Sequence, residues 1–234
     1  MTLLLSAFFV AVVLPNFIGC QDLTAGKETV NNSGQVTLRF FLELDPNVYG
    51  KSFFKKPPQF AVWLEDASKG TIRTVWVTYG TGSGDWGQNI VRPVSLPYWV
   101  SRWNLETNSS SFPTPENPVV DAVTGATPRT VFMVEASVEA GSVWDYFIEV
   151  NVSGDYNDTF PAVKKDGTPD EHGNGQPSII YKGRINASPG RQSVPRLAGR
   201  TDQWQSVKYI ITDLKGITTA KDLLSEIKVS CQSP

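Results

Sequence analysis

The sequence predicts a mostly β protein, an immunoglobulin-like β-sandwich with one short C-terminal helix. Three observations support this fold class. Runs of β-branched and aromatic residues alternate with polar residues along most of the chain, turn-forming residues separate these runs, and helical spacing of apolar residues occurs only near the C-terminus. Apolar residues make up 40% of the chain, which is enough for a packed core, so we expect a globular protein rather than a disordered one.

The first part of the chain supplies three expected strands. Residues 35–44 alternate between apolar and polar and are followed by the turn-forming sequence Asp-Pro-Asn. Residues 60–65 and 71–78 form the next two expected strands. Asp66–Gly70 lies between them and contains the Asp and Gly residues that tight turns favour, so these two strands are expected to form a hairpin.

The second part supplies four expected strands and the helix. The strands cover residues 130–138, 144–152, 178–185 and 206–212, and the last of them completes the sandwich. Apolar residues recur at helical spacing from Ile217 to Ile227, and Thr218 or Thr219 can cap the start, which predicts the short helix, with residues 227–229 turning back into a strand. The predicted core includes Phe40, Leu42, Val62, Val75, Val134, Phe147, Val150, Ile180 and Ile210.

Two long segments between the strands are expected to be loops. Residues 80–130 are expected to be irregular but ordered and functional, because long loops rich in aromatic residues are seldom simple connections. Leu96–Trp103 within this segment is expected to cap one end of the core. Residues 154–177 carry several carboxylates without EF-hand spacing, so we expect a solvated acidic loop rather than a Ca²⁺ site.

The first 20 residues are expected to be a signal peptide. Leu3–Leu14 is apolar but shorter than the roughly 20 residues that span a bilayer. Phe17–Cys20 resembles a bacterial lipobox, which predicts a periplasmic or cell-surface protein anchored to the membrane by a lipid on Cys20. The alternatives are cleavage near Cys20 without a lipid, and a disulfide between Cys20 and Cys231. Residues 21–34 are expected to be a flexible tether to a single domain of residues 35–234.

Charge and histidine content argue against several classes of function. The net charge of −2 and the absence of a basic stripe argue against nucleic-acid binding. His172 is the only histidine and there is no Cys-x-x-Cys, which argues against zinc sites and against Ser-His or Cys-His catalysis. Glu135, Glu139 and Glu149 fall in expected strands, and we interpret them as outward-facing residues rather than paired catalytic carboxylates. We therefore expect an electron carrier or a binding module rather than a stand-alone enzyme.

A seven-residue motif, Asp-Ala-Val-Thr-Gly-Ala-Thr, ends at Thr127 and carries the clearest functional signal. Thr127 offers a hydroxyl that a transferase can modify, and Gly125 and Ala126 are small enough to let an enzyme pocket close over the chain. Asp121 is a candidate to orient the loop or a metal-bound phosphate, and Thr124 is a candidate to form a hydrogen bond across the turn. The same residues suit a structural turn with Gly125 at positive φ, so both interpretations stay open.

The motif resembles the acceptor motif of proteins that carry FMN covalently, through its phosphate, on the last Thr. Together with residues 58–66, 72–75 and 147–157, it resembles a family of predicted periplasmic proteins of unknown function with an Ig-like β-sandwich. The resemblance covers most of residues 35–230. It implies that a flavin transferase attaches FMN to Thr127 and that the protein exchanges electrons with membrane redox proteins outside the cytoplasm. Trp99 and Trp103 are candidates to stack on the flavin ring.

The motif also resembles a loop in the Ig-like part of flagellar hook-capping proteins, where it is a structural connection. The alternative function is therefore a non-catalytic Ig-like module that binds a partner or supports an assembly of the cell envelope. The oligomeric state is not predicted by any feature of the sequence.

Overall fold

The computed structural model describes residues 34–86, 95–120, 124–204 and 207–234. All of them belong to one unit of the chain, residues 32–234. The expected signal peptide, most of the tether, Cys20 and Asp121 lie outside the described residues.

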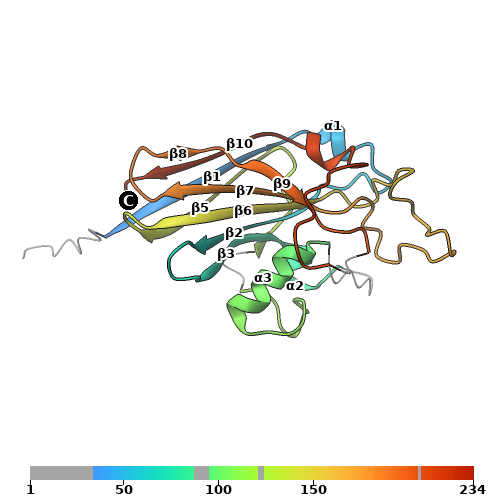
Figure 1. The fold of residues 1–234 in the computed structure, drawn as a ribbon, viewed down its shortest axis with the longest axis horizontal. Coiled ribbons are helices and arrows are strands. Elements are labelled where there is room, and N and C mark those ends of the chain that lie inside the picture. The colour runs from blue at the N-terminus through green and yellow to red at the C-terminus, as the bar shows by residue number, and fades with distance from the viewer. Residues whose placement is uncertain (1–33, 87–94, 121–123, 205–206) are drawn as a thin grey trace, which may run out of the picture. The chain divides into compact units, whose positions relative to one another are not determined.

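Two β-sheets form the body of this unit (Figure 1). The four-stranded sheet has the order β5 (Val131–Glu139), β1 (Gln35–Leu44), β10 (Leu224–Gln232) and β8 (Gln192–Ser193). The six-stranded sheet has the order β4 (Thr124–Gly125), β3 (Ile72–Thr78), β2 (Gln59–Asp66), β6 (Val143–Asn151), β7 (Ile179–Asn186) and β9 (Arg196–Arg200). The predicted mostly β sandwich is therefore confirmed, whereas immunoglobulin-like connectivity stays a prediction.

Apolar side chains fill the space between the sheets. Alternation along β1 places Phe40 and Leu42, both fully buried, on the inner face, and Val62 faces them from β2. Val75 and Val150 belong to the same cluster, and Val134 packs against it while partly buried. These predicted core residues are confirmed.

A second apolar cluster covers the outer face of the six-stranded sheet. Phe147 and Ile180 are core residues as predicted, but they lie in this second cluster, against which the partly buried Ile210 packs. Trp63 stacks on Phe147 with nearly parallel rings 5.1 Å apart. The strands β2 and β6 are thus buried on both faces, because helix α3 (Pro97–Thr107) lies over the outer face beside β2 and β3 (Figure 1).

The segment expected to be an irregular loop contains two helices, so that expectation is wrong for part of it. Helix α2 (Tyr79–Ser83) is a single turn, and α3 is 11 residues long. Pro97 stands in the first turn of α3, where its missing N–H costs nothing, and Asn108 ends the helix in the left-handed conformation. The aromatic residues that suggested a cap on the core are the apolar face of this helix.

The C-terminal part differs most from the predictions. The short helix is a single 3-10 turn, Ala220–Asp222, and Ile227 belongs to β10. Residues 207–212 contribute only an isolated bridge between Arg200 and Ile211, so the predicted strand there is wrong. Strand β10 closes the sandwich instead, between β1 and β8. Its pairing with β1 from Thr37 to Leu44 explains why tertiary contacts override the helical spacing of the local sequence.

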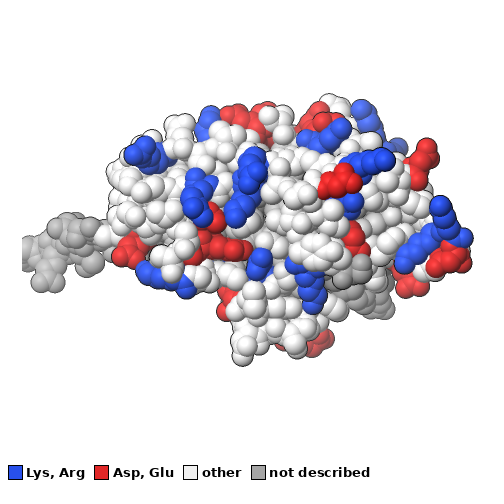
Figure 2. Space-filling model, viewed as in Figure 1, with Lys and Arg blue, Asp and Glu red and all other residues white. Residues whose placement is uncertain are grey.

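One further element and the charge distribution complete the fold. Helix α1 (Pro46–Tyr49) follows β1 and begins at Asp45, whose side chain accepts a hydrogen bond from the Asn47 backbone N–H at 2.8 Å. On the face shown in Figure 2, acidic and basic side chains are interspersed. Among the described residues, no helix is both long enough and apolar enough to cross a membrane.

Candidate functional site

The part of the motif that the structure describes begins in the six-stranded sheet. Thr124 and Gly125 form β4, which pairs in parallel with β3 opposite Val77 and Thr78. A Cβ atom at position 125 would lie 3.1 Å from Nε1 of the buried Trp76. Gly125 does not have a positive φ, so the expected reason for a glycine here is wrong. The close approach of the Trp76 indole is what favours a residue without a side chain.

The second half of the motif leaves the sheet and reaches a pocket. Ala126 is exposed and Thr127 is half-buried. Thr127 lines a pocket of about 370 Å³, which we call the Thr127 pocket. Its other lining residues are Phe54, Lys56, Pro57, Gln59, Trp86 and Ser153. Because this volume is within the usual range for small-molecule sites, the motif delivers a hydroxyl group to a space that can hold a ligand.

Two glycines lie against the aromatic rings that line the Thr127 pocket. The Trp86 ring lies against Gly80 of α2, where an added Cβ would be 3.0 Å from ring carbons. The Phe54 ring lies against Gly154, where an added Cβ would be 2.5 Å from ring carbon Cδ2. Gly154 also has a φ of +75°, a conformation that other residues rarely adopt. Both rings therefore lie in close contact with the backbone at these glycines.

The polar side chains of the Thr127 pocket are mainly hydrogen-bond donors. The Gln59 carbonyl oxygen Oε1 accepts hydrogen bonds from the hydroxyls of Thr78 at 2.6 Å and Thr81 at 3.0 Å. With its oxygen held in this way, the amide nitrogen of Gln59 remains as a donor. Lys56 is exposed and adds an ammonium group. A pocket with apolar walls and these donors suits a flat ligand that carries acceptor atoms or negative charge.

Trp99 and Trp103 do not serve as ring partners for this pocket, contrary to expectation. Trp99 is fully buried in the second apolar cluster and donates a hydrogen bond from Nε1 to the Thr74 hydroxyl at 3.2 Å. Trp103 is 4% exposed and lines a separate pocket of about 320 Å³. The two pockets have no lining residue in common. The tryptophan that lines the Thr127 pocket is Trp86.

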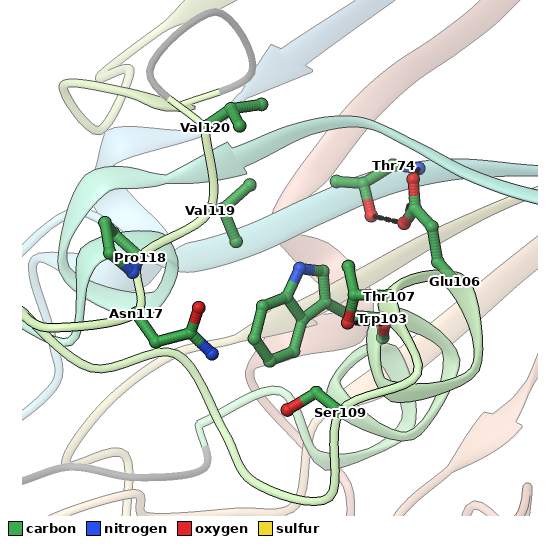
Figure 3. Close-up of a pocket in the computed structure, with 9 residues that line it drawn as sticks. All are labelled: Thr74, Trp103, Glu106, Thr107, Ser109, Asn117, Pro118, Val119 and Val120. Atoms are coloured by element: carbon green, nitrogen blue, oxygen red, sulfur yellow. Dashed lines mark hydrogen bonds between the residues drawn. The ribbon is translucent and has the colours of Figure 1, made fainter.

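Figure 3 shows the pocket that Trp103 lines, between the end of α3 and the segment that follows it. Glu106 on α3 points toward β3, and its carboxylate accepts hydrogen bonds from the backbone N–H of Thr74 at 2.9 and 3.0 Å and from its hydroxyl at 2.6 Å. This carboxylate is therefore engaged in attaching the helix to the sheet, beside an irregularity in the β2–β3 pairing where β3 carries the extra residue Val75.

Glu149 does not face outward as the sequence suggested. It is fully buried, and its carboxylate accepts hydrogen bonds from the backbone N–H groups of Tyr98 at 3.3 Å and Trp99 at 2.5 Å and from the Ser178 hydroxyl at 2.5 Å. Leu96, the residue before α3, provides no side-chain cap, so Glu149 caps the helix from another element. Burial raises the pKa of Glu149 to about 7, and these hydrogen bonds oppose the shift only in part.

The other candidate carboxylates form surface ion pairs or are buried in the loop of residues 154–177. Glu135 and Glu139 are exposed on β5, as expected, and pair with Arg39 and Lys69 respectively. Asp155, by contrast, is 5% exposed, so the interpretation of residues 154–177 as a solvated loop is wrong at this position. Burial raises the pKa of Asp155 to about 7. In the part of the chain that the structure describes, no three His, Cys, Asp or Glu side chains gather as a metal site would require.

The position of Cys231 in the sequence suggested a frayed end, but the residue lies in a well-packed strand. It is 2% exposed on β10, opposite Leu38 of β1, and it belongs to the core between the sheets. Burial raises the pKa of its thiol, so it behaves as a small apolar residue.

No family model, no curated protein and no solved structure was found to match this chain. The residues that the sequence interpretation missed are Phe54, Lys56 and Trp86, which come from segments without strand or helix periodicity. The only local signals were aromatic residues beside Gly- and Pro-rich stretches, and such signals do not say which segments meet in space.

Proposed function

We propose that this protein is exported, carries FMN bound covalently through its phosphate to Thr127, and acts in electron transfer outside the cytoplasm. The observation that carries the proposal is the position of Thr127 in the motif. The motif is fixed in the sheet at Thr124 and Gly125 and then brings the Thr127 hydroxyl to a pocket with apolar walls and an ammonium group. These residues fit a flavin, which is flat, largely apolar and attached to an anionic phosphate.

The attachment reaction asks little of this chain. A flavin transferase with FAD and Mg²⁺ supplies the chemistry: the Thr127 oxygen forms a bond to the FMN phosphorus, the bond to the AMP phosphate breaks, and the hydroxyl proton passes to a base. This chain contributes the acceptor oxygen and its presentation. Pro128 restricts the backbone of Thr127 to extended angles, and the small, exposed Ala126 leaves room for the transferase. Asp121 is proposed to help the loop dock.

When bound, FMN supplies reversible electron transfer, and the chain's own residues hold and shield it. Membrane redox proteins are the proposed partners. A lipid on Cys20 would keep the protein at the membrane where such partners lie, and the apolar Leu3–Leu14 followed by Phe17–Cys20 supports this location.

Intact-mass spectrometry tests the proposal directly. The chain is co-expressed with a flavin transferase that modifies a known acceptor in the same cells. We expect the mass of FMN minus water to be added to the wild-type chain, none to Thr127→Ala, and part of it to Thr127→Ser because the hydroxyl survives. Asp121→Ala should reduce the yield. Thr130→Ala is the matched control, since this exposed hydroxyl lies three residues away, and it should be fully modified.

Absence of the adduct from the wild-type chain, with the known acceptor modified, would overturn the proposal. The motif is then a strand connection, for which β4 and the contact of Gly125 with Trp76 already give a structural reason. The protein would then be assigned to the second class, a non-catalytic binding or structural module of the cell envelope.

A further inference from the structure

We infer that the Thr127 pocket is a preformed seat for the flavin ring, with the isoalloxazine against Phe54 and Trp86 and the phosphate facing Lys56. This inference rests on the proposed function for the identity of the ligand. It goes further because it names the residues that hold the ring, and it makes the pocket a binding site even without the covalent bond.

The rigidity of the aromatic walls is the first argument. Phe54 and Trp86 come from segments far apart in the sequence, and each ring lies against a glycine that has no side chain to displace it. A larger residue at position 154 would force the Phe54 ring to move, and one at position 80 would crowd the Trp86 ring. Rings held in this way lose little conformational entropy when a flat ligand stacks on them, which increases affinity.

The position of the hydrogen-bond donors is the second argument. The pyrimidine end of the flavin ring carries only carbonyl oxygens and ring nitrogens as acceptors, and the Gln59 amide nitrogen is a donor of fixed orientation because its oxygen is held by Thr78 and Thr81. Lys56 lines the same pocket as Thr127, and we assign its ammonium group to the phosphate that Thr127 would carry. A phosphodiester keeps one negative charge, which an ammonium group neutralises.

Ser153 lines the pocket with a hydroxyl that already has a hydrogen-bond partner. It is 7% exposed, and its hydroxyl donates to the Asn151 side-chain oxygen at 3.3 Å. Asn151 in turn donates to the backbone oxygens of Asn174 and Gln176. The Ser153 hydroxyl is therefore engaged by Asn151, which leaves Lys56, Gln59 and Thr127 as the candidate donors to a ligand.

The experiment measures binding of free flavins to the full chain made without a flavin transferase. Flavin fluorescence is titrated with protein, once with FMN and once with riboflavin, which lacks the phosphate. We expect both flavins to bind and to be quenched by Trp86. Trp86→Leu should weaken both by about fivefold to tenfold, because stacking on an aromatic ring is lost. Lys56→Gln should weaken FMN by a similar factor and leave riboflavin unchanged.

Matched variants control for general effects. Trp204→Leu removes a tryptophan that lies outside the Thr127 pocket, and Lys51→Gln removes an exposed lysine from the same region of the chain. Both should bind FMN as the wild type does. Circular dichroism of every variant checks that the fold is retained.

The outcomes separate this inference from the proposed function. The flavin-binding site is overturned, and the carrier function kept, if Thr127 gains the FMN adduct but free flavin does not bind. The same conclusion holds if free flavin binds and Trp86→Leu and Lys56→Gln leave that binding unchanged. Binding of free FMN that both variants weaken, with no adduct, keeps the seat and overturns the covalent function. Equal loss of riboflavin and FMN binding in Lys56→Gln contradicts the phosphate contact.

Discussion

Glu149 on β6 accepts a 2.5 Å hydrogen bond from the backbone N–H of Trp99 on α3. This contact joins the sheet to a helix residue that lies 50 residues earlier in the chain. The Glu149 carboxylate serves as the N-terminal cap that the helix's own sequence lacks. Glu149 therefore joins α3 to the sheet at the start of the helix, as Glu106 does near its end.

Replacing Glu149 should destabilise the protein strongly. Glu149→Ala leaves the N–H groups of Tyr98 and Trp99 and the Ser178 hydroxyl without their acceptor, in a site closed to water. We expect a loss of about 2–4 kcal/mol in the free energy of unfolding, measured by urea denaturation. Glu135→Ala is the control, because this exposed carboxylate should change stability by no more than about 0.5 kcal/mol. Equal effects of the two substitutions would contradict the capping role.

Stability should fall as the pH rises from about 4 to about 7. Burial raises the pKa of Glu149 from 4.5 and that of Asp155 from 3.8, each to about 7 in the folded protein. The folded state therefore binds more protons than the unfolded state within this range. The resulting stabilisation is fully present below the unfolded pKa values and is lost as the pH passes through the folded ones. We expect a decrease on the order of 1–3 kcal/mol per group, measured as unfolding free energy between pH 4 and 8.

A substitution can assign part of this pH dependence. Glu149→Gln cannot titrate, so its unfolding free energy should depend less steeply on pH than that of the wild type, although its absolute value is lower. An unchanged slope would mean that Glu149 does not titrate in this range.

Gly125→Ala should destabilise the sheet edge at the motif. The new methyl group would lie 3.1 Å from Nε1 of Trp76, which is buried and has little freedom to move. We expect a loss of about 1–2 kcal/mol, seen as a lower Tm. Gly34→Ala is the matched control, because no atom lies within 4 Å of the added carbon and its φ is not positive, so its Tm should stay close to that of the wild type.

Trp99→Phe should separate core packing from flavin attachment. Trp99 is fully buried in the second apolar cluster, and the substitution removes buried volume and the hydrogen bond to Thr74. We expect stability to fall by about 1–3 kcal/mol in urea denaturation. The FMN adduct on Thr127 should form as in the wild type, and its loss in a folded variant would show that Trp99 contributes to the site.

The strands were the predictable part of this fold, because period-two alternation reports burial on one face. Strand β1 matches its predicted range, and β6 and β7 match within one residue at each end. The same reasoning cannot show that β6 is buried on both faces, since that depends on a helix from a distant segment. Glu149 was misplaced for this reason: a charged residue on a strand suggests solvent until α3 is known to cover it.

The candidate site was predictable only in part. The motif identified Thr127, but no local pattern links it to Phe54, Lys56 or Trp86. The folded structure brings these three residues to the same pocket, although they lie far from Thr127 in the sequence. Trp99 and Trp103 were chosen as ring partners because they are close in sequence and aromatic. Those properties equally describe the apolar face of a helix, which is the role that they have.

The four-stranded sheet sets a condition on how this chain becomes folded. Its two central strands are β1 and β10, which pair from Thr37 with Gln232 to Leu44 with Leu224. Strand β1 therefore cannot complete its pairing until β10 is present. A fragment that lacks β10 cannot form this pairing. Such long-range closure makes folding slow and late. The edge of β1 that β10 covers is therefore unpaired in any partly folded state that lacks β10, and such an edge is open to pairing with another chain.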